Sequence, residues 1–279
     1  MEYFSPGNPD TPQRITYTYD YLKKERMEFV EPKPAAESDI LLVHSKELLA
    51  KVKSGDFFDP DTPSLENIYY YAALSAGGAI KAMEYALKKE SAFSLMRPPG
   101  HHAGKDSLGG FCYFNNLAIA VKKASSTVKK IAILDIDCHH GNGTEEIFLG
   151  QSEILFISLH REFLYPGSGL KSHKNCLNYP LNAETDESAY MATLKTALAR
   201  IREFKPGLLA VSAGFDTYKS DPVAGMGLEI GSFQKIGSEI ASLNIPYFCV
   251  LEGGYSGELS SCIYAFLTGC VFPIFGGHK

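Results

Sequence analysis

The most informative chemical signal of this 279-residue chain is a run of alternating acids and histidines from Asp135 to His140. Side chains at positions i and i+2 of an extended chain point the same way, so Asp137 and His139 can bind one ion together. With Asp216 as a third ligand, these three residues leave one coordination position of the ion open, as catalytic zinc sites do. The alternative is that these acids cap turns after a strand. Burying several acids together is costly unless a cation or hydrogen bonds compensate, which favours the metal site.

Two adjacent histidines form a second signal. The segment 97–104 is a stiff loop in which prolines restrict the backbone and Gly100 allows a close approach. A lone buried histidine is usually a structural residue, but His101 and His102 follow a strand end and face the predicted metal, which favours acid–base groups. Asp135 and Asn142 are the expected partners of their far ring nitrogens.

Two aromatic and glycine-rich segments accompany these groups. Tyr255 follows Gly253-Gly254, so the segment is either a glycine-rich turn or the support of a phenol that donates to a developing oxyanion. Phe111 lies in a segment that would usually be a packed loop, but beside a metal it would form one wall of a narrow apolar channel. Tyr165, just before a Pro-Gly turn, would form the opposite wall.

Short apolar runs precede the reactive residues and predict the elements that position them. Four to six apolar residues without polar alternation are typical of strands covered on both faces, as in parallel sheets. The predicted strands are 40–43, 92–96, 131–134, 154–157, 208–211 and 247–251. Helical patterns at 69–89 and 189–204 alternate with them, which indicates a βαβ architecture. Because ligands bind at the carboxyl ends of such strands, the reactive residues should share one edge of the sheet.

Composition narrows the class of protein. Hydrophobic residues make up 45% of the chain and charged residues 21%, as in globular proteins, and the net charge of -5 argues against direct nucleic-acid binding. The polar N-terminus does not resemble a signal peptide. The longest apolar stretch, 262–275, is too short and interrupted to span a membrane and predicts a buried C-terminal helix. Six cysteines without a C-x-x-C pair indicate reduced thiols and a cytoplasmic protein. The sequence gives no indication of oligomeric state.

Taken together, these segments resemble the zinc-dependent histone deacetylase family, including its acetylpolyamine amidohydrolase and bacterial deacetylase-like branches. The matching motifs, in the family's order, are Arg97 to Ala103, Gly110 to Asn116, Asp135 to Gly143, Ser158 to His160, Ala213 to Asp216 and Leu251 to Tyr255. The resemblance implies an arginase/deacetylase-like fold, with residues 1–279 as a single three-layer α/β/α domain. Its mostly parallel central sheet would have about eight strands.

The resemblance also implies roles for individual residues. Asp137, His139 and Asp216 would bind Zn²⁺ or, because two carboxylates and one imidazole suit both ions, Fe²⁺. His102 would be the general base, and His101 would stabilise the transition state. Tyr255, Gly110, Phe111, Tyr165 and the rim acid Asp61 would contact the substrate. A structural K⁺ would be held by Asp135, by the carbonyl groups of Asp137 and His139, and by Ser158 and Leu159.

The expected reaction is hydrolysis of an acetylated amine by a metal-activated water, which releases acetate. The substrate would be acetyl-lysine in a protein or peptide, or a small acetylated amine. Three departures from the family bear on this. Gly7–Asp10 replaces a His-Pro-Glu segment, Asn142 stands where some members have Asp, and Val223 stands where a polyamine-specific branch has Glu. The last weakens a polyamine substrate without excluding it.

Two other functions remain as alternatives. A two-metal ureohydrolase would need further carboxylates beside the ion, but Gly141 and Gly214 stand at the two positions where they would lie. A catalytically inactive binder of acetylated ligands would be expected to lack a metal ligand or the tyrosine, and the chain retains both.

Overall fold

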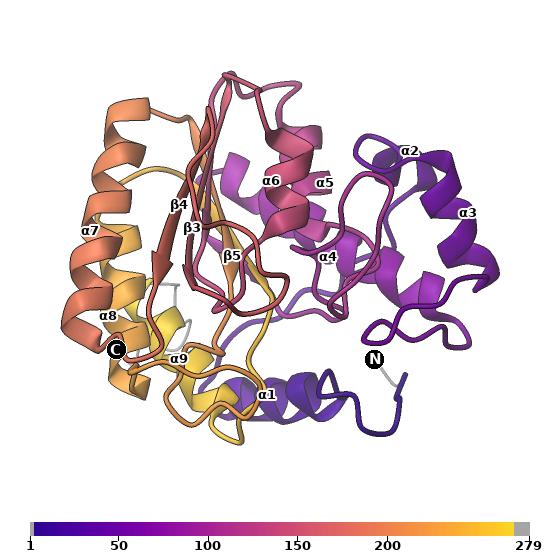
Figure 1. The fold of residues 1–279 in the computed structure, drawn as a ribbon, viewed down its shortest axis with the longest axis horizontal. Helices are drawn as coiled ribbons and strands as arrows, with labels where there is room; N and C mark the ends of the chain where they lie inside the picture. The colour runs from indigo at the N-terminus through magenta and orange to yellow at the C-terminus, as the bar shows by residue number, and fades with distance from the viewer. Residues whose placement is uncertain (1–2, 271–279) are drawn as a thin grey trace.

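The structure, a computed structural model, describes residues 3–270, and its centre is a parallel β-sheet (Figure 1). The strands are β1 (Ala92–Ser94), β2 (Ile131–Asp135), β3 (Ile154–Arg161), β4 (Cys176–Leu181), β5 (Leu208–Ala213) and β6 (Tyr247–Leu251). In space their order is β1-β6-β5-β2-β3-β4, and each neighbouring pair is parallel. All the carboxyl ends therefore meet at one edge.

Helices cover both faces of the sheet, which confirms the predicted three-layer fold (Figure 1). One face packs against α4 (Ile68–Leu87) and α5 (Asn116–Ala124), with α6 (Asn142–Phe148) on the same side. The other face packs against α7 (Glu187–Phe204), α8 (Ile230–Ala241) and α9 (Leu259–Gly269). The remaining helices are α1 (Gln13–Lys24), which packs on α9, and α2 (Glu37–Ile40) and α3 (Lys46–Ser54), which pack on α5 and α4.

The strands are apolar along most of their length because helices cover both faces of the sheet. In β2, Ile131 and Ile133 point into the core beneath α4 and α5, while Ala132 and Leu134 point into the core beneath α7. Full burial of each Ile or Leu side chain stabilises the fold by roughly 1.5–3 kcal/mol. A polar residue within β2 would therefore be destabilising on either face, and its first acid, Asp135, stands at the strand's carboxyl end.

Five of the six predicted strands are present, and the prediction for 40–43 is wrong. Ile40 ends the short helix α2, and the next residues form turns. Ile40 and Val43 are buried whereas Leu41 and Leu42 are 36% and 49% exposed. The buried residues are thus three positions apart, which is helical spacing. The apolar run had concealed that periodicity.

Strand β4 was not predicted because its sequence lacks the signal of a buried strand. It lies at the edge of the sheet, has β3 as its one neighbouring strand among residues 3–270, and is half-buried along much of its length. It also contains Asn178 and Pro180, and proline is tolerated in a sheet mainly at edges.

The predicted helices at 69–89 and 189–204 correspond to α4 and α7. Helix α7 begins after Asp186, whose side chain accepts a hydrogen bond from the Ala189 amide as an N-cap does. The predicted C-terminal helix is α9; positions 271–275 of that prediction lie outside the described residues. Within the described part of the chain, every helix is too short or too polar to cross a bilayer.

Candidate metal centre and pocket

The parallel register brings the reactive residues to one edge. Asp135 at the end of β2 pairs with Ser158 of β3 on one side and with Ser212 of β5 on the other. Strand β5 in turn pairs with β6, which ends just before Glu252. Segments separated by more than a hundred positions in the sequence therefore contribute side chains to one site.

Asp137, His139 and Asp216 form a group suited to a metal ion. Their ligand atoms all lie within 4.8 Å of one another. Nδ1 of His139 is 3.1 Å from Oδ1 of Asp137 and 2.8 Å from Oδ2 of Asp216. Both carboxylates are fully buried, and among the described residues Oδ2 of Asp216 receives no hydrogen bond of acceptable geometry. A buried carboxylate oxygen without a donor fits a cation.

The electrostatics of this group also favour the binding of a positive charge. Burial raises the pKa of Asp216 to about 7, and the nearby Asp137 carboxylate raises it further. Burial would lower the pKa of His139, but the carboxylates of Asp137 and Asp216, which both lie close to its Nδ1, raise it to about 10. Two acids that compete for one imidazolium would be better neutralised by a divalent cation.

The glycines around the metal group make space for it and exclude other side chains. A Cβ atom on Gly214 would lie 2.2 Å from Oδ2 of Asp137, and one on Gly141 would lie 2.2 Å from Oδ2 of Asp135. No carboxylate fits at either position. The two-metal alternative therefore lacks room for the further ligands it requires.

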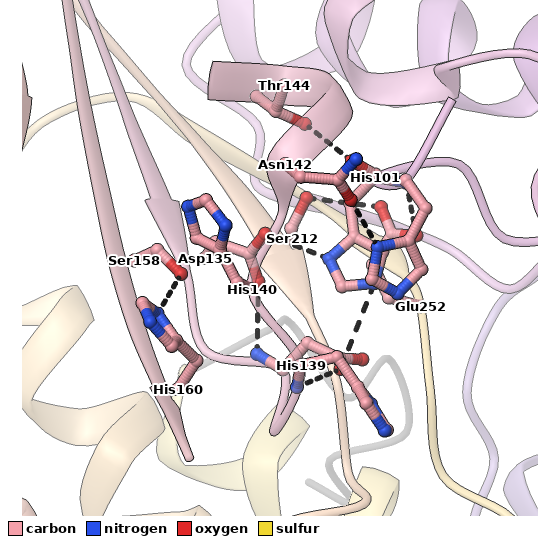
Figure 2. Close-up of polar contacts among 12 residues, drawn as sticks. His101, Asp135, His139, His140, Asn142, Thr144, Ser158, His160, Ser212 and Glu252 are labelled. Atoms are coloured by element: carbon pink, nitrogen blue, oxygen red, sulfur yellow. Dashed lines mark hydrogen bonds and ion pairs between the residues drawn. The ribbon is translucent and has the colours of Figure 1, made fainter. Parts of the chain in front are cut away.

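The two adjacent histidines have the expected partners, and Figure 2 labels His101 and both partner residues, Asp135 and Asn142. Nδ1 of His101 is 3.0 Å from Oδ2 of Asp135, and Nδ1 of His102 is 2.7 Å from Oδ1 of Asn142. The centroids of the two imidazole rings are 4.0 Å apart. Each Nδ1 donates its proton to an oxygen, so in a neutral ring Nε2 is the free acceptor.

The two rings differ in charge. Burial would lower the pKa of His101, but the carboxylates of Asp135 and Asp137 raise it to about 10. Burial lowers the pKa of His102 well below its usual value, and the neighbouring His101 and His139 lower it further. His102 is therefore a neutral imidazole next to a positively charged one.

Sequence reasoning did not assign a role to Glu252, which holds the histidine loop in place. Its carboxyl group is fully buried and accepts hydrogen bonds from the amides of Gly100 (2.7 Å) and His101 (3.1 Å) and from the hydroxyl of Ser212 (3.1 Å). Burial raises its pKa to about 7. The signal available in the sequence was an acid directly after the predicted strand 247–251.

Sequence reasoning also missed Arg14, which supports the tyrosine loop. Its guanidinium lies 4.6 Å from the ring centroid of Tyr255 and donates to the carbonyl oxygens of Gly254 (2.7 Å) and Glu252. Asp10 pairs with Arg14 at 2.7 Å and with Arg97 at 3.1 Å. The segment Gly7–Asp10, which differs from the family pattern, thus contributes an acid that fixes two arginines.

A cavity of about 260 Å³ lies over the metal group and contains the predicted substrate contacts. Its lining includes Asp61, His101, His102, Gly110, Phe111, Asp137, His139, Leu164, Tyr165, Val223, Gly253 and Tyr255. The rings of Phe111 and Tyr255 are 5.8 Å apart, and those of His102 and Tyr165 are 4.9 Å apart. Two residues of the candidate metal group, the two adjacent histidines and three aromatic side chains therefore face one space.

The residues predicted to hold K⁺ lie at and just after the carboxyl end of β2 and in the part of β3 that pairs with it, where Asp135 is the partner of Ser158. Asp135, Ser158 and Leu159 are fully buried. Oδ1 of Asp135 accepts a hydrogen bond from the Asp137 amide, and Oγ of Ser158 is 2.9 Å from Nδ1 of His160. These contacts are among protein groups, and the potassium site stays a prediction.

Comparison with known proteins finds deacetylases and related amidohydrolases. The model of the histone deacetylase domain matches residues 8–270. A probable deacetylase of Archaeoglobus fulgidus is 38% identical over 91% of this chain and 78% of its own length. Acetylpolyamine amidohydrolase 1 of Pseudomonas aeruginosa is 38% identical over 72% of this chain and 62% of its own length.

Solved structures agree with the sequence relatives. The crystal structure of acetylpolyamine aminohydrolase from Burkholderia pseudomallei superimposes with a TM-score of 0.89 at 28% identity, over 96% of this chain and 94% of that one. The HDA15 HD domain gives the same TM-score and identity over 96% of this chain and 83% of its own. With the domain match covering nearly all of the described residues and the same fold in both neighbours, the chain belongs to the histone deacetylase family.

Proposed function

We propose that this chain is a metal-dependent deacetylase, in which one catalytic domain hydrolyses the amide of an acetylated amine. The observation that carries the proposal is the convergence of a metal-ligand group and a neutral, oriented histidine in one cavity. Asp137, His139 and Asp216 would hold the ion. Zn²⁺ and Fe²⁺ both suit two carboxylates and one imidazole.

A bound divalent ion would polarise the amide carbonyl and lower the pKa of a water. His102 would remove a proton from a water as the oxygen of that water attacks the acetyl carbon, and the C–N bond breaks when the amine leaves. Its Nδ1 is held by Asn142, which leaves Nε2 as the acceptor, and burial keeps the ring neutral. His101 would stabilise the developing negative charge as an imidazolium, because Asp135 holds it in the protonated form. A histidine then protonates the leaving amine, giving acetate and the free amine.

Tyr255 would donate its hydroxyl to the oxyanion that forms on the acetyl carbonyl. It lines the cavity, and burial raises the pKa of its phenol well above the usual value, so the hydroxyl keeps its proton. The main-chain amide of Tyr255 donates to Oδ2 of Asp221 at 2.7 Å, and Arg14 packs on its ring. These contacts fix the segment that follows Gly253-Gly254.

The mouth of the cavity supports a substrate with a positive charge beyond the acetylated nitrogen. Asp61 lines the cavity and is exposed, and the nearby Asp59 acts electrostatically on Tyr165, as Asp61 does. Neither acid takes part in an ion pair with another residue in the range 3–270. Several relatives are named acetylpolyamine amidohydrolases. Acetylated diamines and acetyl-lysine peptides are both compatible with the negative charge of Asp59 and Asp61.

The test is acetate release from an acetyl-lysine amide and from an acetylated diamine, after the metal-stripped protein is reloaded with Zn²⁺, Fe²⁺ or Co²⁺. We expect turnover that depends on the ion and is abolished by a chelator. Comparison of kcat/KM for the two substrates then identifies the preferred class. Binding of both amides without turnover under any of the three ions would contradict the proposal and favour an inactive binder.

A further inference from the structure

A second pair of histidines lies beneath the wall of the pocket, and neither the proposed chemistry nor the metal group uses it. His140 and His160 are 3% and 0% exposed, and their ring centroids are 4.7 Å apart. Figure 2 shows both, with the bond from Ser158 to His160. Buried imidazoles with defined partners hold other groups in place, so the question is what these two hold.

His140 connects α6 to the loop that follows β3. Its Nε2 is 2.8 Å from Oε2 of Glu145, which also accepts from the side-chain amide of Asn178 at 2.7 Å. Its Nδ1 is 2.8 Å from Oγ of Ser168. Because a carboxylate only accepts, Nε2 carries the proton that faces Glu145, and Ser168 is bound by the other nitrogen.

His160 binds the next residue of the same loop. Its Nε2 is 3.2 Å from the carbonyl oxygen of Gly169, so that nitrogen is the donor, and its Nδ1 accepts from the hydroxyl of Ser158. Gly169 has a φ of +79°, and a Cβ atom there would lie 2.6 Å from both imidazole rings. The loop backbone therefore rests directly on the histidine pair.

This loop carries one wall of the substrate cavity. Leu164 and Tyr165 line the cavity, and the Tyr165 ring packs edge-on against His102 at 4.9 Å. Tyr165 is 44% exposed, so burial alone does not fix it. The Gly167 amide bonds back to the carbonyl of Leu164 at 2.7 Å, which joins the wall to the anchored residues in one turn.

We propose that His140 and His160 are positioning residues that hold the Leu164–Tyr165 wall through Ser168 and Gly169 and so set the affinity for substrate. His140 directly follows the proposed ligand His139, so the same short segment fixes the metal and the wall. The kinetic part of this inference rests on the proposed function; the anchoring itself does not.

The first test measures anchoring without activity. The chain contains no tryptophan, so Tyr165→Trp introduces a single fluorescent reporter in the wall. In the Tyr165→Trp variant, the further substitution Ser168→Ala should increase the fast component in the decay of the tryptophan fluorescence anisotropy. Ser168→Thr, which keeps the hydroxyl, should leave this component unchanged. Leu170→Ala is the control in the same loop, since this side chain is 44% exposed and outside the cavity lining. Identical decays for the parent and Ser168→Ala would overturn the proposal.

The second test is kinetic and uses Tyr165 intact. Loss of one hydrogen bond of about 1 kcal/mol predicts a roughly five- to tenfold higher KM for Ser168→Ala with kcat nearly unchanged. Ser168→Thr should restore KM, and the metal content should match the parent. An equal fall in kcat, or no rescue by threonine, would contradict a positioning role. If no variant or parent turns over any acyl amide, the proposed function fails, while the anisotropy still decides the anchoring.

Discussion

The floor and the mouth of the cavity are built differently. At the floor, Asp137 and Asp216 are fully buried, His101 is 3% exposed, and each is held from a strand end or by a buried partner. At the mouth, Asp61 is exposed and Tyr165 is 44% exposed, and both stand on loops. Rigid strand ends thus position the chemistry, whereas loops provide the contacts that differ between substrates.

This difference between floor and mouth predicts which measured quantity each variant should change. Changes at the floor should lower kcat or the stability of the fold, because they disturb groups that are bonded on several sides. Changes at the mouth should mainly alter KM, because they remove contacts that only a bound substrate makes.

Tyr255→Phe should lower kcat by about 10²–10³-fold, as loss of one oxyanion donor does in other enzymes. Metal content should be unchanged, because the phenol is not among the proposed ligands. Steady-state kinetics and metal analysis of the same preparation check both points. A Phe variant with parental kcat would remove Tyr255 from the mechanism.

Protonation of His44 should destabilise the support behind the histidine loop. Its Nδ1 donates to the Gly104 carbonyl at 2.9 Å, and its Nε2 accepts from the Asn115 amide at 2.8 Å. Burial lowers its pKa to about 4. Because the folded-state pKa lies below the ordinary value of about 6.5, the stabilisation is complete above pH 6.5 and is lost as the pH falls toward 4.

The expected loss over that range is on the order of 3 kcal/mol in the free energy of unfolding. Urea titrations at several pH values, compared with His44→Asn, measure it. The parent should lose more stability than the variant between pH 7 and pH 4. Parallel pH dependences of the two proteins would show that His44 does not contribute.

Glu252→Ala should lower kcat about tenfold, because each buried amide left without an acceptor costs roughly 1–3 kcal/mol and the histidine loop would shift to compensate. Glu252→Gln is the matched control. Its amide oxygen can still accept from Gly100 and His101, and the parent carboxyl has a pKa of about 7. The Gln variant should keep most of the activity; equal losses in both would point to the charge and not to loop placement.

Asp61→Asn should have the smallest effect, a two- to fivefold rise in KM for a cationic substrate, since exposed charges contribute roughly 0.2–1 kcal/mol. The rise should shrink at high salt. An uncharged acetylated amine serves as the control substrate, and its KM should not change. If the neutral substrate is affected equally, Asp61 acts on the shape of the rim and not through charge.

The sequence was informative where the physical pattern is local. Continuous apolar runs predicted β2, β5 and β6, and alternation after β2 predicted that Asp137 and His139 would share a side. The partners Asp135 and Asn142 of the two histidines were expected because the far ring nitrogen of such an imidazole usually bonds to an oxygen, and they are found at 3.0 and 2.7 Å.

What the sequence did not reveal depends on contacts between distant segments. Arg14 binds the carbonyl of Gly254, 240 positions away, and no spacing rule connects them. Glu252 reaches back to Gly100 across the sheet. The bond between Nε2 of His160 and the carbonyl of Gly169 likewise joins β3 to the loop that follows it, and no periodicity in the sequence indicates it.

The central claim is that Asp137, His139 and Asp216 bind one catalytic ion. The most direct measurement is metal stoichiometry, by elemental analysis after dialysis with Zn²⁺, for the parent and for Asp137→Ala, with acetate release followed on the same samples. We predict one ion per chain and turnover in the parent, and neither in the variant. An Asp137→Ala protein that still hydrolyses acetyl-lysine amide without bound metal, or two ions per chain in the parent, would contradict the account.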